Sequence, residues 1–366
     1  MSYNLRLKAT AIGSLPYDNP KTALDIVFGN FSDIPFWPQL AHVNRLEDMN
    51  TQYIQGVPGI KYDDKKEKYI FDTQSDDFYI ELEDFFLDYE AIVGEKDFTN
   101  LEKYAITAPF SSSFDLYLDM LKNGNYEYAK GHVTGAFTWG TSICDCENQC
   151  SFYDETCREI LVKSVILKAI WQIQKIKSIS PDITPIIFFD EPVMSQYGTS
   201  AFVTVKRSDI VETFSSVASV VKEFGAISAI HCCGKSDWSL LIESGVDMIN
   251  LDAYFFSKSL CTYHKEVKSF LEKENSGYIA WGFVPTLDKD ALAEITVEKL
   301  EDMFDKAIDA LSKKGIDKNL ILNKSLITPS CGAGSLSFEL AQKAMTSTKE
   351  LSEKLQAKYT NQYEVI

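Results

Sequence analysis

A histidine and two cysteines end an apolar run in the stretch AISAIHCCG, at residues 226–234. Side chains at positions i and i+2 of a strand point to the same side. His231 and Cys233 are therefore expected to face one way, and Cys232 the other way, where we assign it to packing. Cys331, in TPSCGAG, ends the last apolar run of the chain and supplies a third soft ligand.

Imidazole and thiolate ligands together select Zn²⁺, and three protein ligands with one open position are typical of a catalytic zinc site. His231, Cys233 and Cys331 are therefore predicted to bind zinc. The alternative is that they are packed core residues, because free cysteines are often buried.

Eight apolar runs that end in turn signals are predicted to be strands: 9–16, 34–40, 131–137, 183–192, 226–234, 246–254, 277–285 and 325–332. Apolar residues at helical spacing predict helices between or after several of them, at 158–178, 207–225, 297–315 and 337–355. Eight strands alternating with helices predict a single (β/α)8 TIM barrel in one domain, residues 1–366. Two Rossmann-like halves are the competing interpretation, but no G-x-G-x-x-G opens a helix.

One segment breaks this alternation. Residues 60–105 are rich in acidic and aromatic side chains and match no strand and helix unit. We interpret them as a surface excursion of helices and a hairpin inserted beside the barrel, in preference to an element that binds a partner.

Polar residues follow several of the predicted strands. In barrel enzymes the catalytic groups lie at the carboxyl ends of the strands. The candidates at these ends are Gly13, Ser14, His132, Thr134, Asp190, Glu191 and Asp252. Together with the three soft ligands, they predict one site at the mouth of the barrel.

Composition limits the classes of partner. The 366 residues contain 53 acidic against 36 basic side chains, and the formal charge of −17 repels phosphate backbones and anionic membranes. Nucleic acid and membrane partners are therefore not expected. With no apolar stretch of roughly 20 residues and no signal-peptide core at the start, we expect a cytoplasmic protein, in which thiols stay reduced.

A second group of cysteines lies in CDCENQCSFYDETC, at positions 144, 146, 150 and 157. Its spacing is neither the paired C-x-x-C of zinc ribbons nor a familiar iron–sulfur run. We take reduced cysteines in a loop and a helix start as the default, with a second metal site or a redox role as the alternative.

Four motifs in this order resemble one family. ATAIGSLP at 9–16, FDEP at 189–192, HCC at 231–233 and TPSCG at 328–332 are similar to the motifs of the C-terminal catalytic barrel of cobalamin-independent methionine synthase. The wider superfamily includes uroporphyrinogen decarboxylase and corrinoid-dependent zinc methyltransferases that methylate coenzyme M. The spacing of His-x-Cys and a distant Cys-Gly is specific, whereas IGS or DEP alone is weak.

The resemblance implies a methyltransferase that forms methionine from homocysteine. It implies that His231, Cys233 and Cys331 bind zinc, that Ile12, Gly13 and Ser14 hold the amino-acid carboxylate, and that Asp190, with Glu191 beside it, pairs with the ammonium group. Asp252 is the nearest match to a glutamate ligand of the family, and is expected to be a ligand, a partner of His231 or a strand-end cap.

The methyl donor is expected to be a methylated corrinoid, either methylcobalamin or a corrinoid protein. The family's folate-dependent enzyme has a large N-terminal half that this chain lacks, so the resemblance implies a core-only form. A methyl group leaves cobalt without a proton, whereas folate N5 must be protonated. His132 is a candidate catalytic residue beside the donor.

Three alternatives stand beside this prediction. The acceptor is homocysteine or another small thiol such as coenzyme M. A non-catalytic accessory protein that binds zinc or a corrinoid would bind metal without methyl transfer. Porphyrinogen decarboxylation is disfavoured, because it needs no metal and uses an arginine-rich motif near the N-terminus that this chain lacks.

Overall fold

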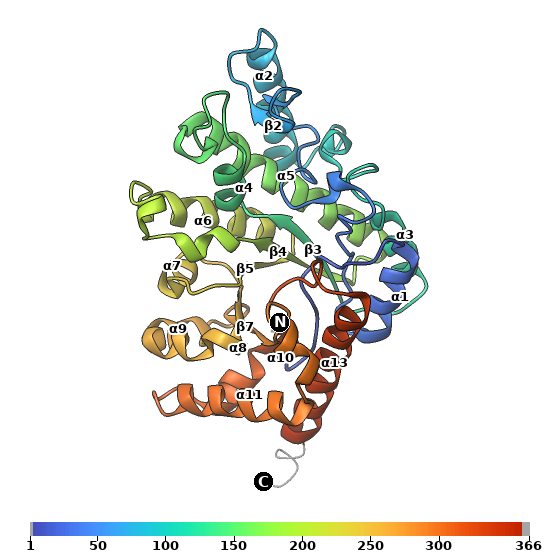
Figure 1. Cartoon of the computed structure of the whole chain (residues 1–366). Coiled ribbons are helices and arrows are strands. Elements are labelled where there is room, and N and C mark those ends of the chain that lie inside the picture. Colours follow the sequence, from blue (N-terminus) through green and yellow to red (C-terminus); the bar gives the residue numbers. More distant parts are fainter. Residues whose placement is uncertain (1–2, 361–366) are drawn as a thin grey trace.

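The structure, a computed structural model, describes residues 3–360 and has one parallel sheet enclosed by helices (Figure 1). Six strands hydrogen-bond in the order in which they occur along the chain. They are β3 (Tyr128–Thr134), β4 (Thr184–Asp190), β5 (Ile227–Cys232), β6 (Met248–Asp252), β7 (Tyr278–Val284) and β8 (Ser325–Pro329). All five pairings are parallel, so the carboxyl ends of the strands meet at one end of the sheet.

The prediction of a closed eight-stranded barrel is wrong, because this sheet is a six-stranded half-barrel. The runs at 9–16 and 34–40 form no strand and make only isolated bridges, such as Ala9 to Ile327 of β8 and Phe36 to Lys130 of β3. Pro35 and Pro38 have no N–H to donate, which prevents a continuous ladder through the second run. The first run meets β8 through only a few hydrogen bonds, including that from Thr10 N to Ile327 O at 3.1 Å.

Helices cover the outer side of the sheet. The predicted helical segments are close to α5 (Glu155–Ile179), α6 (Arg207–Glu223), α11 (Val297–Ser312) and α13 (Phe338–Thr360). Side-chain caps fix the start of two of them, since Asp154 accepts a hydrogen bond from Cys157 N and Thr296 accepts one from Lys299 N. The other α-helices are α1 (Pro20–Asn30), α2 (Phe78–Tyr89), α3 (Phe114–Lys122), α4 (Ala136–Ser142), α7 (Trp238–Glu243), α8 (Ala253–Phe256), α9 (His264–Leu271), α10 (Lys289–Glu294) and α12 (Lys318–Asn323).

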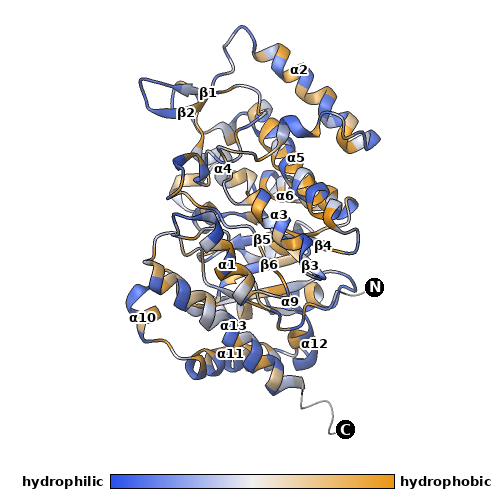
Figure 2. Ribbon diagram, turned by 90° about the vertical axis from the view of Figure 1, so that its right-hand side faces the viewer, coloured by the Kyte–Doolittle hydropathy of each residue, from blue (hydrophilic) through white to orange (hydrophobic). Residues whose placement is uncertain are grey.

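Alternation along each strand separates two cores. Apolar side chains on the outer side pack against the helices in the larger cluster. Those on the inner side form a smaller cluster that includes Tyr128, Phe188, Ala229 and Ala280. Figure 2 shows hydrophilic and hydrophobic residues alternating along the helices, as expected for helices with one buried face. Within residues 3–360, no helix combines the length and the apolar character that crossing a membrane requires.

The segment 60–105 forms an excursion beside the sheet, at the top of Figure 1. It contains the antiparallel hairpin β1 (Ile60–Asp63) and β2 (Lys68–Phe71), α2, the π-helix η2 (Glu90–Glu95) and the 3-10 helix η3 (Leu101–Tyr104). The buried Lys168 of α5 ties both ends of the excursion down, because its ammonium donates to the carbonyl oxygens of Gln55 and Ala105.

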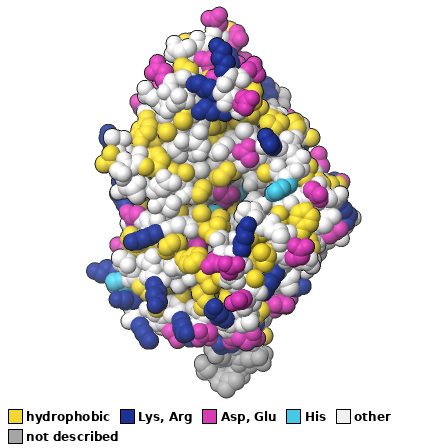
Figure 3. Space-filling model, in the orientation of Figure 1, with side chains coloured by type: hydrophobic (Ala, Val, Ile, Leu, Met, Phe, Trp, Pro, Cys, Tyr) yellow, Lys and Arg dark blue, Asp and Glu magenta, His cyan; other side chains and the backbone are white. Residues whose placement is uncertain are grey.

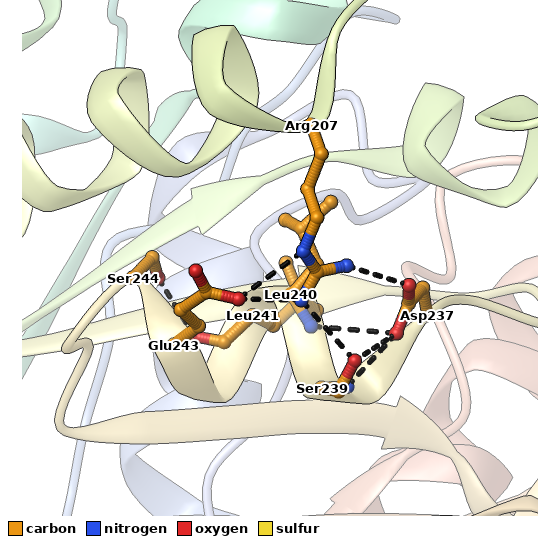
Figure 4. A network of polar contacts seen from close by, with 7 residues as sticks. All are labelled: Arg207, Asp237, Ser239, Leu240, Leu241, Glu243 and Ser244. Atoms are coloured by element: carbon orange, nitrogen blue, oxygen red, sulfur yellow. Dashed lines mark hydrogen bonds and ion pairs between the residues drawn. The ribbon is translucent and has the colours of Figure 1, made fainter.

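Polar contacts fix the remaining connections. Arg207 at the start of α6 donates to Asp237 at 2.8 Å and to Glu243 at 2.6 Å, which joins α6 to both ends of α7 (Figure 4). The other 3-10 segments are η1 (Arg45–Glu47), η4 (Ser151–Tyr153), η5 (Pro192–Gln196), η6 (Ser200–Phe202) and η7 (Ser257–Tyr263).

Gly277 begins the approach to β7 and gives a matched test of this fold. It has φ +82°, and an added Cβ would overlap the carbonyl oxygen of Phe270. Gly315 has a similar φ of +87° with no atom within 4 Å of such a Cβ among the described residues. We expect Gly315→Ala to lower the free energy of unfolding by about 1 kcal/mol, and Gly277→Ala by more than about 3 kcal/mol, because its backbone must move. Urea unfolding measures both, and equal losses would contradict this packing.

Candidate metal centre

Three soft ligands converge at the carboxyl ends of the strands. His231 is in β5, Cys233 directly follows β5, and Cys331 lies two residues after the end of β8. One possible ligand atom from each lies within 4.8 Å of the other two. His231 is buried, whereas both cysteines are half-buried. The three side chains could hold a metal ion, with the cysteines forming its solvent-facing side.

Asn250 of β6 determines which nitrogen of His231 faces this cluster. Its Nδ2 donates to the carbonyl oxygen of Ala280 at 2.8 Å, which requires its Oδ1 to point to His231 Nδ1, at 2.5 Å. Oδ1 can only accept, so Nδ1 of the imidazole carries a proton and Nε2 is the nitrogen left to face the cysteines. Within residues 3–360, Nε2 is buried and has no hydrogen-bond partner. Burial lowers the pKa of His231, but Cys233, Asp190 and Asn250 outweigh burial and raise it above its ordinary value, so a metal ion would bind Nε2 in place of a proton.

The pKa values of the Cys233 and Cys331 thiols are shifted in opposite directions. A hydrogen bond from Cys331, with further help from His231, outweighs burial and lowers the pKa of Cys233 to about 4. The same hydrogen bond and burial raise the pKa of Cys331. Cys233 is thus the thiolate of the pair, and only the thiolate form of a cysteine binds metal.

Asp190, the last residue of β4, stands beside His231 in the sheet register. Burial raises the pKa of its carboxyl group, while the charges of His231 and Lys130 oppose that effect. In the described part of the chain, its buried Oδ1 has no hydrogen-bond partner. An acceptor with unused hydrogen-bonding capacity next to the ligands can receive a cationic or N–H group of a bound molecule.

Lys130 of β3 was missed by the sequence reasoning. It is buried inside the sheet, with its ammonium 4.4 Å from the ring centre of Phe188. Burial lowers the pKa of Lys130 to about 8, and Asp190 opposes this shift. Its signal in the sequence is the spacing KGHVT, which puts Lys130 two residues before His132 and therefore on the same inner face. Asn250, which the sequence reasoning also missed, likewise lies two residues before Asp252 and on the same face of β6.

His132 packs within the core and does not meet the ligands. Its ring stacks on Trp37 with centroids 4.1 Å apart, and a Cβ at Gly13 would lie 2.5 Å from its Cε1. Burial and the charge of Lys130 hold the pKa of His132 well below its ordinary value. The imidazole is therefore neutral. Position 13 must be glycine, because the backbone there passes too close to the His132 ring to leave room for a side chain. Ile12 contributes a buried side chain to the inner core.

Glu191 caps a helix. Its carboxylate accepts hydrogen bonds from Phe137 N at 3.0 Å and Thr138 N at 2.8 Å, in the first turn of α4. Burial raises the pKa of Glu191 to about 7, although those hydrogen bonds partly offset the shift. Both oxygens face α4, which places them apart from the ligand cluster.

Ser14 contacts the loop that carries Cys331. Its carbonyl oxygen accepts from Ala333 N at 2.9 Å, and a Cβ at Gly332 would overlap its hydroxyl. The structure thus brings the first and last motifs of the chain together. At the neighbouring β3 end, Thr134 donates to Met49 O.

Asp252 lies at the end of β6 and caps α8. Its Oδ1 accepts from Phe255 N at 3.0 Å, while its buried Oδ2 has no partner among the described residues. Burial raises the pKa of Asp252 to about 6 against the effect of that cap, and Cys233 adds to the rise. Asp252 is close enough to influence Cys233 but is not among the three residues whose possible ligand atoms lie within 4.8 Å of one another.

The second group of cysteines forms no metal cluster of three or more ligands in the described chain, where the only such group is that of His231, Cys233 and Cys331. All eight cysteines lie in the described residues and are free thiols.

Figure 3 shows hydrophobic side chains gathered in the middle of the face seen in Figure 1, and charged ones mainly towards its upper and lower ends.

No protein-family model matches the chain, and the curated proteins include no significant match. The likeness of its short motifs to methionine synthase therefore stays a prediction.

The hydrogen bond from His231 to Asn250 gives a direct test of the centre. We expect Asn250→Leu to weaken binding of Co²⁺, used as a probe ion, about 10- to 100-fold, because the imidazole loses the group that fixes its tautomer. Competition with a chelator measures the affinity.

Ser228→Ala provides the control. Ser228 lies at the other end of β5 and donates to Asp247 at 2.9 Å. Its loss is expected to lower stability while Co²⁺ affinity stays unchanged. Equal weakening in both variants would show that Asn250 acts only through stability.

Proposed function

We propose that this protein is a zinc-dependent methyltransferase that methylates the thiol of homocysteine to form methionine. The single observation that carries the proposal is the convergence of the buried, unpartnered Nε2 of His231 with two half-buried thiols, within 4.8 Å of one another among the described residues. One imidazole and two cysteines suit Zn²⁺ better than harder cations, which prefer oxygen ligands. Three protein ligands leave a fourth position for a substrate.

Bound zinc would lower the pKa of an acceptor thiol, which is otherwise mostly protonated near neutral pH, and so present it as a thiolate. The chain's own residues prepare this position. Asn250 orients the imidazole, and without metal the Cys331 thiol stabilises the Cys233 thiolate through a hydrogen bond, whose proton zinc binding would release. Cysteine ligands keep the bound acceptor electron-rich, which favours its attack on a methyl group.

The acceptor is proposed to be an amino-acid thiol. Asp190 stands beside His231 and has an unpaired carboxylate oxygen within the described chain, which suits an ammonium group. The same carboxylate would repel the sulfonate of coenzyme M. Ser14 and the glycine-rich loop after Cys331 provide a hydroxyl and close backbone for the acceptor's carboxylate.

The donor is proposed to be a methylated corrinoid, free or carried by a protein. A methyl group on folate N5 needs a general acid, whereas one on cobalt leaves without a proton. Of the titratable groups near the strand ends, Glu191 is held by the cap of α4, and the ring of His132 is stacked on Trp37. The proposal of a corrinoid therefore rests on the leaving-group chemistry.

A purely zinc-binding accessory role would favour a closed site with four protein ligands. Asp252 could close it through its Oδ2, which has no partner among the described residues, while its Oδ1 is held by the cap of α8. The two cysteines are only half-buried, which supports catalysis over storage of the metal.

Two adjacent cysteines test the zinc requirement. Cys233→Ala is expected to reduce bound zinc from one per chain to near zero and to abolish methyl transfer from methylcobalamin to homocysteine. Cys232→Ala removes a neighbouring thiol that faces the outer core, and should keep both zinc and activity. Metal analysis and a methionine assay measure the two outcomes. Activity that survives complete zinc loss would overturn the mechanism.

Asp190 tests the identity of the acceptor. Asp190→Asn removes the negative charge and should weaken binding of the ammonium group by about 1.5–3 kcal/mol. This loss is equivalent to a rise in KM for homocysteine of about 10- to 150-fold, and the zinc content should stay unchanged. Glu191→Gln is the matched control, since this neighbour faces α4, and its KM should stay close to that of the parent. An unchanged KM in Asp190→Asn would exclude an ammonium contact at this carboxylate.

A further inference from the structure

The segment after α4 folds back on itself and brings two cysteines face to face. Cys144 and Cys150 pair in an isolated antiparallel bridge. Hydrogen bonds from Asp145 N to Gln149 O at 2.9 Å and from Ser151 N to Ile143 O at 3.2 Å lie on either side of the pair. Neither cysteine exchanges a backbone hydrogen bond with the other, so they occupy the non-hydrogen-bonded position of the ladder.

This position brings the two thiols within bonding reach. Residues opposite each other in a non-hydrogen-bonded pair have Cα atoms about 4.5 Å apart, with both side chains on one face. Disulfides span Cα separations of about 4.4–6.8 Å. Burial raises the pKa of Cys150, and the charge and side-chain hydrogen bond of Cys144 raise it further, in agreement with direct contact between the thiols.

The surrounding contacts hold the turn in this shape. The Asp145 carboxylate accepts from the backbone N–H groups of Glu147 and Gln149, both at 2.8 Å. The β1–β2 hairpin secures the outer side, since Phe71 N donates to Cys144 O at 2.9 Å and Lys66 Nζ donates to Cys146 O at 2.7 Å. Cys144 and Cys150 are half-buried, which leaves them accessible to a small oxidant, unlike the buried Cys157.

We propose that Cys144 and Cys150 are a reversible redox pair that a low-molecular-weight disulfide, such as oxidised glutathione, converts into a protein disulfide. One cysteine thiolate attacks a glutathione sulfur and releases one glutathione thiolate. The second cysteine then attacks the mixed disulfide and releases the other. The two cysteines lose two protons and two electrons, and one glutathione disulfide becomes two glutathione thiols.

The disulfide would link the end of α4 to the start of η4, at the contact between the sheet and the excursion. The first turn of α4 is the one capped by Glu191, next to Asp190. Oxidation would therefore fix the segment that connects the candidate centre to the β1–β2 hairpin. This inference is independent of the proposed methyl transfer.

The test incubates the full-length, metal-loaded protein in glutathione buffers that range from fully reduced to fully oxidised. After acid quenching and alkylation, peptide mass mapping identifies the bonded cysteines. We expect one disulfide between Cys144 and Cys150, with a mass two hydrogens below that of the two thiols, and its complete reversal by reduced glutathione. Both cysteines remaining reduced in the most oxidising buffer would overturn the proposal.

Serine variants define the partners. Cys144→Ser and Cys150→Ser should each abolish the disulfide, whereas Cys146→Ser, which removes the exposed thiol between them, should retain it. A disulfide that maps to Cys146 in the parent protein would contradict the assignment. Because Cys233 and Cys331 also lie close together, mapping is repeated in Cys233→Ala, where the 144–150 disulfide must persist. If a serine variant fails to fold, mapping of the parent protein still decides.

Discussion

The parallel register of β4, β5 and β6 is the constraint on which the candidate centre depends. It sets Asp190 beside His231 and His231 beside Asn250. Because side chains alternate between the two faces of a strand, a slip of one residue in β5 would turn His231 and Cys233 towards the outer helices and Cys232 towards the mouth. The apolar residues Ile227 and Ala229 oppose such a slip, since they fill the inner core on the same face as His231. Packing of the inner core thus determines that His231 and Cys233 point to the inner face of the sheet.

The interior of the sheet changes from apolar to charged along the strands. Near their amino ends the inner face is packed with aromatic and aliphatic side chains. Towards the carboxyl ends it carries Asp190, His231 and Asp252, and Lys130 lies in the first half of β3, all buried or half-buried. Burial disfavours charge on each of them, and opposite charges partly compensate, as between Lys130 and Asp190. Buried polar groups of this kind are costly to a fold, and their concentration at one end of the sheet makes that end the candidate functional site.

Close backbone contacts surround the carboxyl ends of the strands, where hydrogen bonding between strands stops. Gly13 crosses the ring of His132, and Gly332 lies against Ser14. A side chain at either glycine would displace its neighbour, so these positions have a steric reason for glycine apart from any ligand. The excursion at 60–105 contacts the turn at 144–150 through the hydrogen bond from Phe71 N to Cys144 O. At the strand ends, the chain around Gly13 and the chain around Gly332 lie side by side although they are distant in the sequence.

The sequence by itself determined the local features of this protein. Alternation along AISAIHCCG predicted that His231 and Cys233 share a face, and helical spacing predicted α5 and α11 closely. Tertiary structure decided what depends on partners far along the chain. It left the runs at 9–16 and 34–40 outside the sheet, because single bridges and prolines cannot sustain a ladder. It turned Glu191 towards α4 and enclosed His132 against Trp37, and it supplied Asn250 as the partner of His231. Periodicity fixes only the face on which a side chain lies, whereas its hydrogen-bond partner is set by whichever strand, helix or loop packs against that face.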